Sequence, residues 1–176
     1  CGFTGNGEAR LKGKLAMSLE DGKVWIYTGS TEIGQGTDTI FPQIAAEELG
    51  IELGLVHMAA HDTELVPDSG PTVASRTAMV VGGVCQKAAK ALRFALQEEL
   101  GLEAPFASLL AMRESTQPLR VEAQYVDDGS LQWDDQTYQG DAYPTYGWSC
   151  SIVDLSVDLD TGEVIYERFI SATDVG

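Results

Sequence analysis

The chain has 176 residues, of which 44% are hydrophobic, and this suits one compact domain with a buried core. Its 27 acidic and 11 basic residues give a formal net charge of −16. That charge argues against nucleic acids and acidic membrane surfaces as partners. No apolar run in the sequence approaches the length of a membrane span.

Three cysteines, Cys1, Cys85 and Cys150, lie far apart and show no Cys-x-x-Cys spacing. This pattern favours reduced thiols in a cytoplasmic protein and indicates neither a disulfide framework nor an iron–sulfur site. The sequence begins at Cys1 without an initiator Met and stops soon after a strong strand pattern. We therefore expect residues 1–176 to form a single domain that is a fragment of a longer polypeptide.

The first elements expected along the chain are a hairpin and a helix. Alternating runs at 11–20 and 23–28 flank Asp21-Gly22, a strong signal for a β-hairpin. A helix is expected over residues 39–49, with Thr37-Asp-Thr39 as its cap. Pro42 would then fall in its first turn, and Gly50 is placed to end it. Residues 55–59 are expected to form a short strand.

The longest predicted helix covers residues 74–100 and presents one apolar face. Gly101 is placed to end it, and a short helix is expected over 105–112. Two further hairpins are predicted around Asp127-Asp-Gly129 and Asp160-Thr-Gly162, separated by a loop over 136–145. Antiparallel hairpins packed with two main helices give an α+β fold.

The stretch Gly29-Ser-Thr-Glu-Ile-Gly-Gln-Gly36 follows a predicted strand and precedes a helix start. Backbone N–H groups and the helix dipole can hold an anion in such an arrangement. A nucleotide triphosphatase would need Lys and Ser or Thr where Gln35 and Gly36 stand, so this class is disfavoured. Spacing alone favours the alternative of a tight turn that needs its glycines for backbone reasons.

A second loop, Pro67-Asp-Ser-Gly-Pro-Thr-Val-Ala-Ser-Arg76, leads into the longest helix. Arg76 is the only Lys or Arg between Lys23 and Lys87, and a cation in a first helical turn makes more sense beside an anion. The alternative, that Arg76 pairs with one of the nearby carboxylates, stays open. Our hypothesis is that the two loops together hold one phosphorylated cofactor.

No catalytic or metal-ligating constellation stands out in the sequence. His57 and His61 have the spacing of a zinc-protease helix, but the adjacent Glu is missing and the segment reads as a strand. We therefore assign no catalytic residue and no metal ligand.

Several motifs together resemble the molybdenum-cofactor-binding subunit of the xanthine dehydrogenase and aldehyde oxidase family. The blocks occur in the family's order and cover most of the chain; they are Gly2-Phe-Thr-Gly-Asn-Gly-Glu8, Gly29-Ser-Thr-Glu-Ile-Gly-Gln-Gly-Thr37, Gln43-Ile-Ala-Ala-Glu-Glu-Leu-Gly50, Asp62-Thr63, Pro67-Asp-Ser-Gly-Pro-Thr-Val-Ala-Ser-Arg76 and Asp158-Leu-Asp-Thr-Gly-Glu-Val164. The resemblance implies a molybdenum hydroxylase that inserts a water-derived oxygen into a C–H bond of an N-heterocycle or an aldehyde. A purine-like heterocycle is our preference as substrate.

The resemblance also implies how the cofactor is held. Molybdenum is bound by the pterin dithiolene, in molybdopterin or its cytosine dinucleotide, and electrons leave through iron–sulfur and FAD domains or subunits. By resemblance, Gly34, Gln35 and Gly36 contact the pterin. The residues expected along the phosphate or dinucleotide end are Ser69, Gly70, Thr72, Ser75 and Arg76.

Two parts of the family pattern are missing from this chain by the same resemblance. The glutamate that acts as general base lies downstream of it, and the first half of the molybdenum-binding region lies upstream. We therefore expect one lobe of a larger subunit, whose remainder is its partner, and we expect the chain alone to be inactive and to bind cofactor weakly. The alternatives are a non-catalytic binding or scaffold module of the same fold and, more remotely, a plain nucleotide-binding domain.

Overall fold

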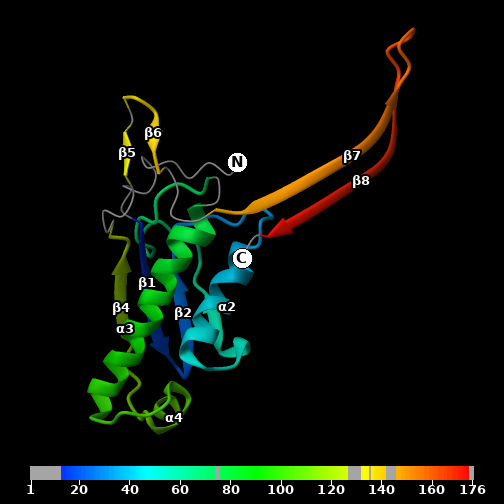
Figure 1. Cartoon of the computed structure of the whole chain (residues 1–176). Helices are drawn as coiled ribbons and strands as arrows, with labels where there is room; N and C mark the ends of the chain where they lie inside the picture. The colour runs from blue at the N-terminus through cyan, green and yellow to red at the C-terminus, as the bar shows by residue number, and fades with distance from the viewer. Residues whose placement is uncertain (1–12, 74–75, 127–131, 135, 142–145, 175–176) are drawn as a thin grey trace.

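The structure is a computed structural model that describes residues 13–73, 76–126, 132–134, 136–141 and 146–174 (Figure 1). Its centre is a four-stranded sheet in the order β3-β2-β1-β4. The strands are β1 (Lys14–Glu20), β2 (Lys23–Tyr27), β3 (Val56–Met58) and β4 (Leu119–Gln124). Two long helices, α2 (Thr37–Leu49) and α3 (Gly82–Leu100), pack against this sheet and against each other, as the α+β prediction requires.

The first predicted hairpin is confirmed, because β1 and β2 pair antiparallel from Glu20↔Lys23 to Ala16↔Tyr27. Asp21 and Gly22 both have positive φ, 49° and 72°, which is what a two-residue hairpin turn with the right twist requires. β3 then pairs parallel to β2 after the short 3₁₀ helix η1 (Leu53–Leu55).

Helix α2 begins two residues earlier than predicted, and the expected cap at residues 37–39 is wrong. Its N-cap is Gly36 in a left-handed conformation, with φ 87°. Pro42 is consequently the sixth helical residue and lies in the second turn, not the first. The predicted end at Gly50 is confirmed, since its N–H donates to the Ala46 and Glu47 carbonyls.

The long helix starts with a π-helical segment, η2 (Thr77–Val81), and continues as α3 to its predicted end at Gly101. The short helix α4 (Phe106–Met112) follows, also as predicted. One side of α3 faces the core, where it meets strands β1 and β4 and helix α2; its buried members are Gly82, Val84, Cys85, Ala88, Ala89, Leu92 and Leu96.

The predicted second hairpin is wrong. Strand β4 pairs antiparallel with β1, from Lys14↔Gln124 to Leu19↔Leu119, and forms one edge of the central sheet. β5 (Trp133–Asp134) pairs instead with β6 (Gln139–Gly140), and β6 lies inside the region expected to be a loop. In β4 the core-facing positions Val121 and Ala123 pack on the main core, so burial beside β1 decides the pairing.

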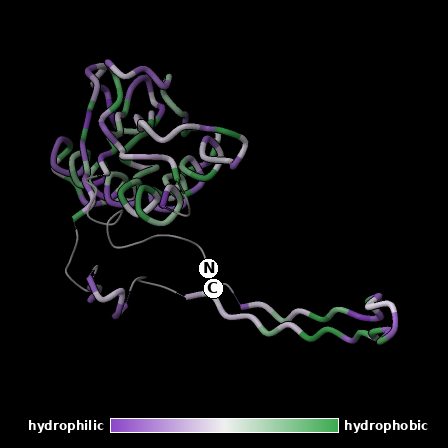
Figure 2. The backbone as a smooth tube through the Cα atoms, turned by 90° about the horizontal axis from the view of Figure 1, so that it is seen from above, coloured by the Kyte–Doolittle hydropathy of each residue, from purple (hydrophilic) through white to green (hydrophobic). Residues whose placement is uncertain are grey.

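The third predicted hairpin is confirmed as β7 (Trp148–Val157) paired antiparallel with β8 (Val164–Asp174). It extends away from the sheet and helices as a long arm (Figures 1 and 2). None of the described helices is both long and apolar enough to cross a bilayer.

Candidate functional site

The two loops singled out in the sequence lie side by side. We call residues 29–36 the first loop and residues 67–76 the second loop. The Gly29 N–H donates to Ser69 Oγ at 2.9 Å, and the Thr31 N–H donates to Thr72 Oγ1 at 2.9 Å. Gly29 also approaches so closely that a Cβ there would lie 3.2 Å from the Pro67 carbonyl oxygen. The geometry therefore allows both loops to touch one guest, as the hypothesis requires.

Ser69 ties the second loop to the sheet. Ser69 is 1% exposed, and its hydroxyl donates to the Lys14 carbonyl at 2.6 Å and lies 2.9 Å from Thr28 Oγ1. Because the one hydroxyl proton is used on Lys14, Thr28 must be the donor in the second bond. In this structure Ser69 therefore supports the loop from within.

Arg76 lies under the same loop, fully buried. Its Nη1 donates to the Ser69 carbonyl at 2.8 Å and to the Pro71 carbonyl at 3.3 Å. Gly70 has φ +74°, and a Cβ there would lie 2.6 Å from Arg76 Nη2. A guanidinium so placed holds the backbone of the loop in shape. A contact between Arg76 and a cofactor phosphate stays a prediction.

A residue that the sequence reasoning missed organises the first loop. The Glu32 carboxylate accepts N–H bonds from Gly34 at 2.7 Å, Gly36 at 3.1 Å and Asp38 at 3.0 Å. These bonds, led by those from Asp38 and Gly36, lower the pKa of Glu32. The N–H groups expected to hold an external anion thus hold the chain's own carboxylate. An acidic residue just before a helix start is the sequence signal that could have found it.

Gln35 also bonds within the first loop, although it is exposed. Its Nε2 donates to the Thr31 carbonyl at 2.7 Å and to Thr37 Oγ1 at 2.6 Å, and its Oε1 accepts the Ile33 N–H at 2.6 Å. The side chain therefore fixes the loop and presents the edge of its amide to solvent.

The predicted site residues divide between two cavities and their supports. Gln35, Gly36 and Thr72 line a cavity of about 200 Å³ between the loops, together with residues of α2 and η2; these further lining residues are Ile33, Thr37, Ile40, Val73, Thr77 and Ala78. Ser69 and Gly70 line a neighbouring cavity of about 320 Å³. Ser75 lies outside the described residues.

The π-helical segment η2 forms one wall of the first of these cavities through Thr77 and Ala78. π-Helical turns are rare and are frequent at functional sites. Thr77 of this turn lines the cavity between the loops, whereas Ala78 also lines the cavity between α2 and α3.

The histidines and the buried thiol do not add a metal or nucleophile site. His61 Nε2 lies 3.2 Å from Asp38 Oδ1, whereas His57 packs on the Trp25 ring with centroids 5.1 Å apart. Within the part of the chain that the structure describes, no group of three or more His, Cys, Asp or Glu side chains could hold a metal ion. Burial raises the pKa of Cys85 to about 12, so this thiol stays protonated and acts as core packing.

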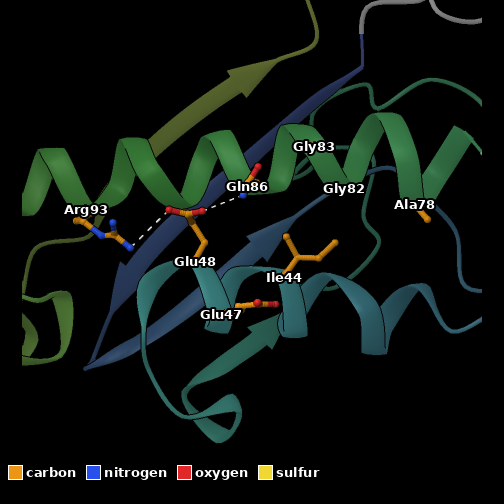
Figure 3. A pocket seen from close by; sticks show the side chains of 8 residues that line it. All are labelled: Ile44, Glu47, Glu48, Ala78, Gly82, Gly83, Gln86 and Arg93. Carbon is orange, nitrogen blue, oxygen red and sulfur yellow. Dashed lines mark hydrogen bonds and ion pairs between the residues drawn. The ribbon is translucent and has the colours of Figure 1, made fainter. Parts of the chain in front are cut away.

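The largest of these cavities, about 550 Å³, lies between α2 and the start of α3 (Figure 3). Glu48 bridges the two helices there, lying 3.0 Å from Gln86 Nε2 and 3.6 Å from Arg93 Nη2. Glu48 and Arg93 are thus paired across a helix–helix contact. This cavity does not include any of the site residues expected from the sequence.

Comparisons with known proteins identify relatives over nearly the whole chain. Residues 2–176 match the molybdopterin cofactor-binding domain family. The chain is 30% identical to the gamma subunit of the 6-hydroxypseudooxynicotine dehydrogenase complex of Paenarthrobacter nicotinovorans, over 88% of this chain and 22% of that subunit. It is 26% identical to a putative xanthine dehydrogenase molybdenum-binding subunit of Escherichia coli K12, over 94% of this chain and 24% of that subunit.

The solved structure of the aldehyde oxidoreductase from Desulfovibrio desulfuricans has the same fold, with a TM-score of 0.72 at 24% identity. The match covers 94% of this chain and 18% of that one. The chain therefore spans about a quarter or less of the length of the proteins that it matches.

Proposed function

The chain belongs to the molybdopterin cofactor-binding domain family, and from this we propose that it is the cofactor-holding lobe of a larger molybdenum hydroxylase subunit. In that role it works with the remainder of the subunit and with iron–sulfur and FAD domains or subunits, in the cytoplasm. The substrate is an N-heterocycle, a purine-like one by preference, or an aldehyde. The short share of each relative that the chain covers supports its being one lobe.

The observation that carries the proposal is the cavity shared by the two loops. Its polar lining residues are all uncharged and are Gln35, Gly36, Thr37, Thr72 and Thr77. Neutral donors suit a polar pterin in a chain of net charge −16, because any carboxylate in the wall would repel the cofactor phosphate. The donor set therefore fits the group that the family name implies.

The residues that would hold the cofactor fall into two kinds. Gly34, Gln35, Gly36 and Thr72 line or border the cavity between the loops and would bind the pterin directly. Ser69 and Arg76 would act indirectly, by holding the backbone of the second loop in the conformation that binds the cofactor, and Gly70 packs on Arg76. Ser75 is the remaining residue that we assign to the site. When bound, the cofactor supplies the two-electron oxidation that converts a substrate C–H and water into C–OH, two protons and two electrons.

Molybdenum content of the intact subunit tests this assignment. Gln35→Ala removes three hydrogen bonds that shape the first loop, each worth about 1 kcal/mol, so we expect at least about tenfold weaker cofactor retention. Arg76→Ala removes the support of the second loop and should also lower the molybdenum that co-purifies with the subunit. Metal is measured by mass spectrometry after gel filtration, with circular dichroism as the check on folding.

Gln86→Ala is the matched control, because Gln86 is an exposed glutamine that bonds to Glu48 in the cavity between α2 and α3, away from both loops. It should leave the molybdenum content unchanged. Thr72→Val is a milder test of the second loop, since it deletes only the acceptor for the Thr31 N–H. Full metal and activity in the Gln35, Thr72 and Arg76 variants would show that the loops are not the cofactor site.

A further inference from the structure

The β7–β8 arm carries an apolar face that nothing in the described chain covers. Every described residue of both strands is exposed. The arm lies away from the sheet and helices in both views (Figures 1 and 2), and Figure 2 shows hydrophobic residues recurring along it. An isolated two-stranded hairpin is marginally stable in water, so such an arm normally has a partner layer.

The strand register brings six apolar side chains together on one face. Directly opposite residues share a face, and so do residues two apart along a strand. Three successive pairs, Val153↔Phe169, Leu155↔Tyr166 and Val157↔Val164, therefore form one continuous surface. A bulge opposite Asp154 and Leu155 leaves Glu167 without a pairing residue and keeps Tyr166 on that surface. We call these six residues the arm face.

The arm face has the exposure of a docking surface. Phe169 is 67% exposed and Tyr166 76% exposed, although both are large aromatic residues. The opposite face carries the Asp154–Arg168 ion pair at 3.5 Å and the Ser156–Glu167 hydrogen bond at 2.9 Å. The opposite face also holds exposed apolar residues, among them Ile152, Ile165 and Ile170, but the ion pair and the hydrogen bond interrupt them. The arm face is continuous, so it is the side that we expect to be covered.

We infer that the arm face docks against an apolar surface of the same subunit, in the part of that polypeptide outside these 176 residues. This inference rests on the proposed function, in which the chain is one lobe of a larger subunit. The relatives are about four times longer than the matched segment, so the subunit holds ample surface to cover it.

The arm also belongs to the fold that the solved neighbour shares. That match omits 6% of this chain, about eleven residues, whereas the two strands of the arm hold 10 and 11 residues. Since the unmatched part of this chain is shorter than the arm, at least part of the arm has a counterpart in the solved neighbour. The chain of that neighbour is about five times longer than this one.

A second copy of the chain is a weaker occupant on physical grounds. Each copy carries a net charge of −16, and this repulsion opposes association. A segment of the same polypeptide is already present at high effective concentration and avoids the cost of bringing two molecules together. A contact with the rest of the same polypeptide is thus favoured over a contact with a second copy of the chain.

Hydrogen–deuterium exchange on the intact subunit tests the inference. We expect the amides of β7 and β8 to exchange at least about tenfold more slowly in the intact subunit than in the 176-residue chain, independent of protein concentration. Phe169→Asp places a charge in the arm face and should abolish most of this protection. Ile165→Asp is the matched control, because Ile165 is a neighbouring exposed aliphatic residue on the opposite face. The arm amides of this variant subunit should exchange within about twofold of the wild-type rate.

Three results would overturn the inference. Unprotected arm amides in the wild-type subunit would show that the face is uncovered, and equal losses for Phe169→Asp and Ile165→Asp would show that the face does not matter. Protection that disappears on dilution would identify a second copy as the occupant. Molybdenum content is measured on the same samples, so a subunit with a protected arm and no molybdenum would contradict the proposed function alone.

Discussion

Residue 70 must be glycine for two separate reasons. Its backbone is left-handed, with φ +74°, and a Cβ would lie 2.6 Å from Arg76 Nη2 and 2.9 Å from Arg76 Cζ. We expect Gly70→Ala to lower the free energy of unfolding by about 3 kcal/mol, from the left-handed strain plus the clash with a buried guanidinium. The measurement is equilibrium unfolding in urea.

Gly22→Ala separates the two reasons. Gly22 has nearly the same φ, +72°, but an added Cβ would meet nothing within 4 Å. Its cost should be the backbone strain alone, about 1–2 kcal/mol. Equal losses for the two variants would mean that Arg76 moves aside freely and that the tight contact with Gly70 does not hold the second loop.

For individual residues, the sequence predicted which of them form the two loops but not which hydrogen-bond partners their polar groups have. Hydroxyl, amide and guanidinium groups were expected to face a ligand because their chemistry suits one. In the structure Ser69 and Arg76 bond inward to carbonyl oxygens, and Gln35 bonds to its own loop. Spacing in a sequence does not show which of several nearby acceptors a donor will reach, so these inward bonds could not be predicted.

Among the elements, helix α3 offers the most direct test of which residues form the core, because a buried and an exposed apolar residue lie only two positions apart along it. Leu92 is fully buried, and Phe94 is 66% exposed. Leu92→Ala should cost about 2–5 kcal/mol of unfolding free energy, since it removes buried methyl groups and leaves a cavity. Phe94→Ala should cost no more than about 0.5 kcal/mol despite the larger deletion.

Urea unfolding followed by far-UV circular dichroism measures both variants. A cost for Phe94→Ala as large as that for Leu92→Ala would mean that the exposed side of α3 is also packed, contrary to the position of α3 against the sheet. The comparison thus checks which face of this helix forms the core.

The elements that could be predicted are those with local signals. Asp-Gly between alternating runs marked the first hairpin, and glycines marked the ends of α2 and α3. The pairing of β4 with β1 could not be predicted this way, because about one hundred residues separate the two strands. A local turn signal at residues 127–129 favoured a neighbour instead, and burial beside β1 decided otherwise.

For the whole molecule, the sheet and its helices form a closed core, whereas the arm presents its polar and apolar groups outward. The proximity of the loops could be expected from the sequence only through resemblance, since 40 or 41 residues separate the bonded pairs Gly29–Ser69 and Thr31–Thr72. The exposed arm face had no sequence signal at all, because the same alternation would describe a strand covered by its own chain.

The last prediction concerns the chain as a catalyst on its own. A general base works best when its pKa lies near the operating pH. Among the described residues, the carboxylates with a resolved pKa shift are Glu32, Asp134 and Asp158, and each pKa is lowered by N–H or hydroxyl donors. Lowered pKa values make these three carboxylates weaker bases.

We therefore expect the purified 176-residue chain to show no hydroxylation of xanthine or of an aldehyde above the protein-free rate, with an artificial electron acceptor and added cofactor present. The intact subunit, assembled with the iron–sulfur and flavin partners of the proposed function, is the positive control. Turnover by the chain alone would refute the expectation and place a base within it. An intact assembly that retains full molybdenum but hydroxylates neither class of substrate would instead favour a non-catalytic module of the same fold.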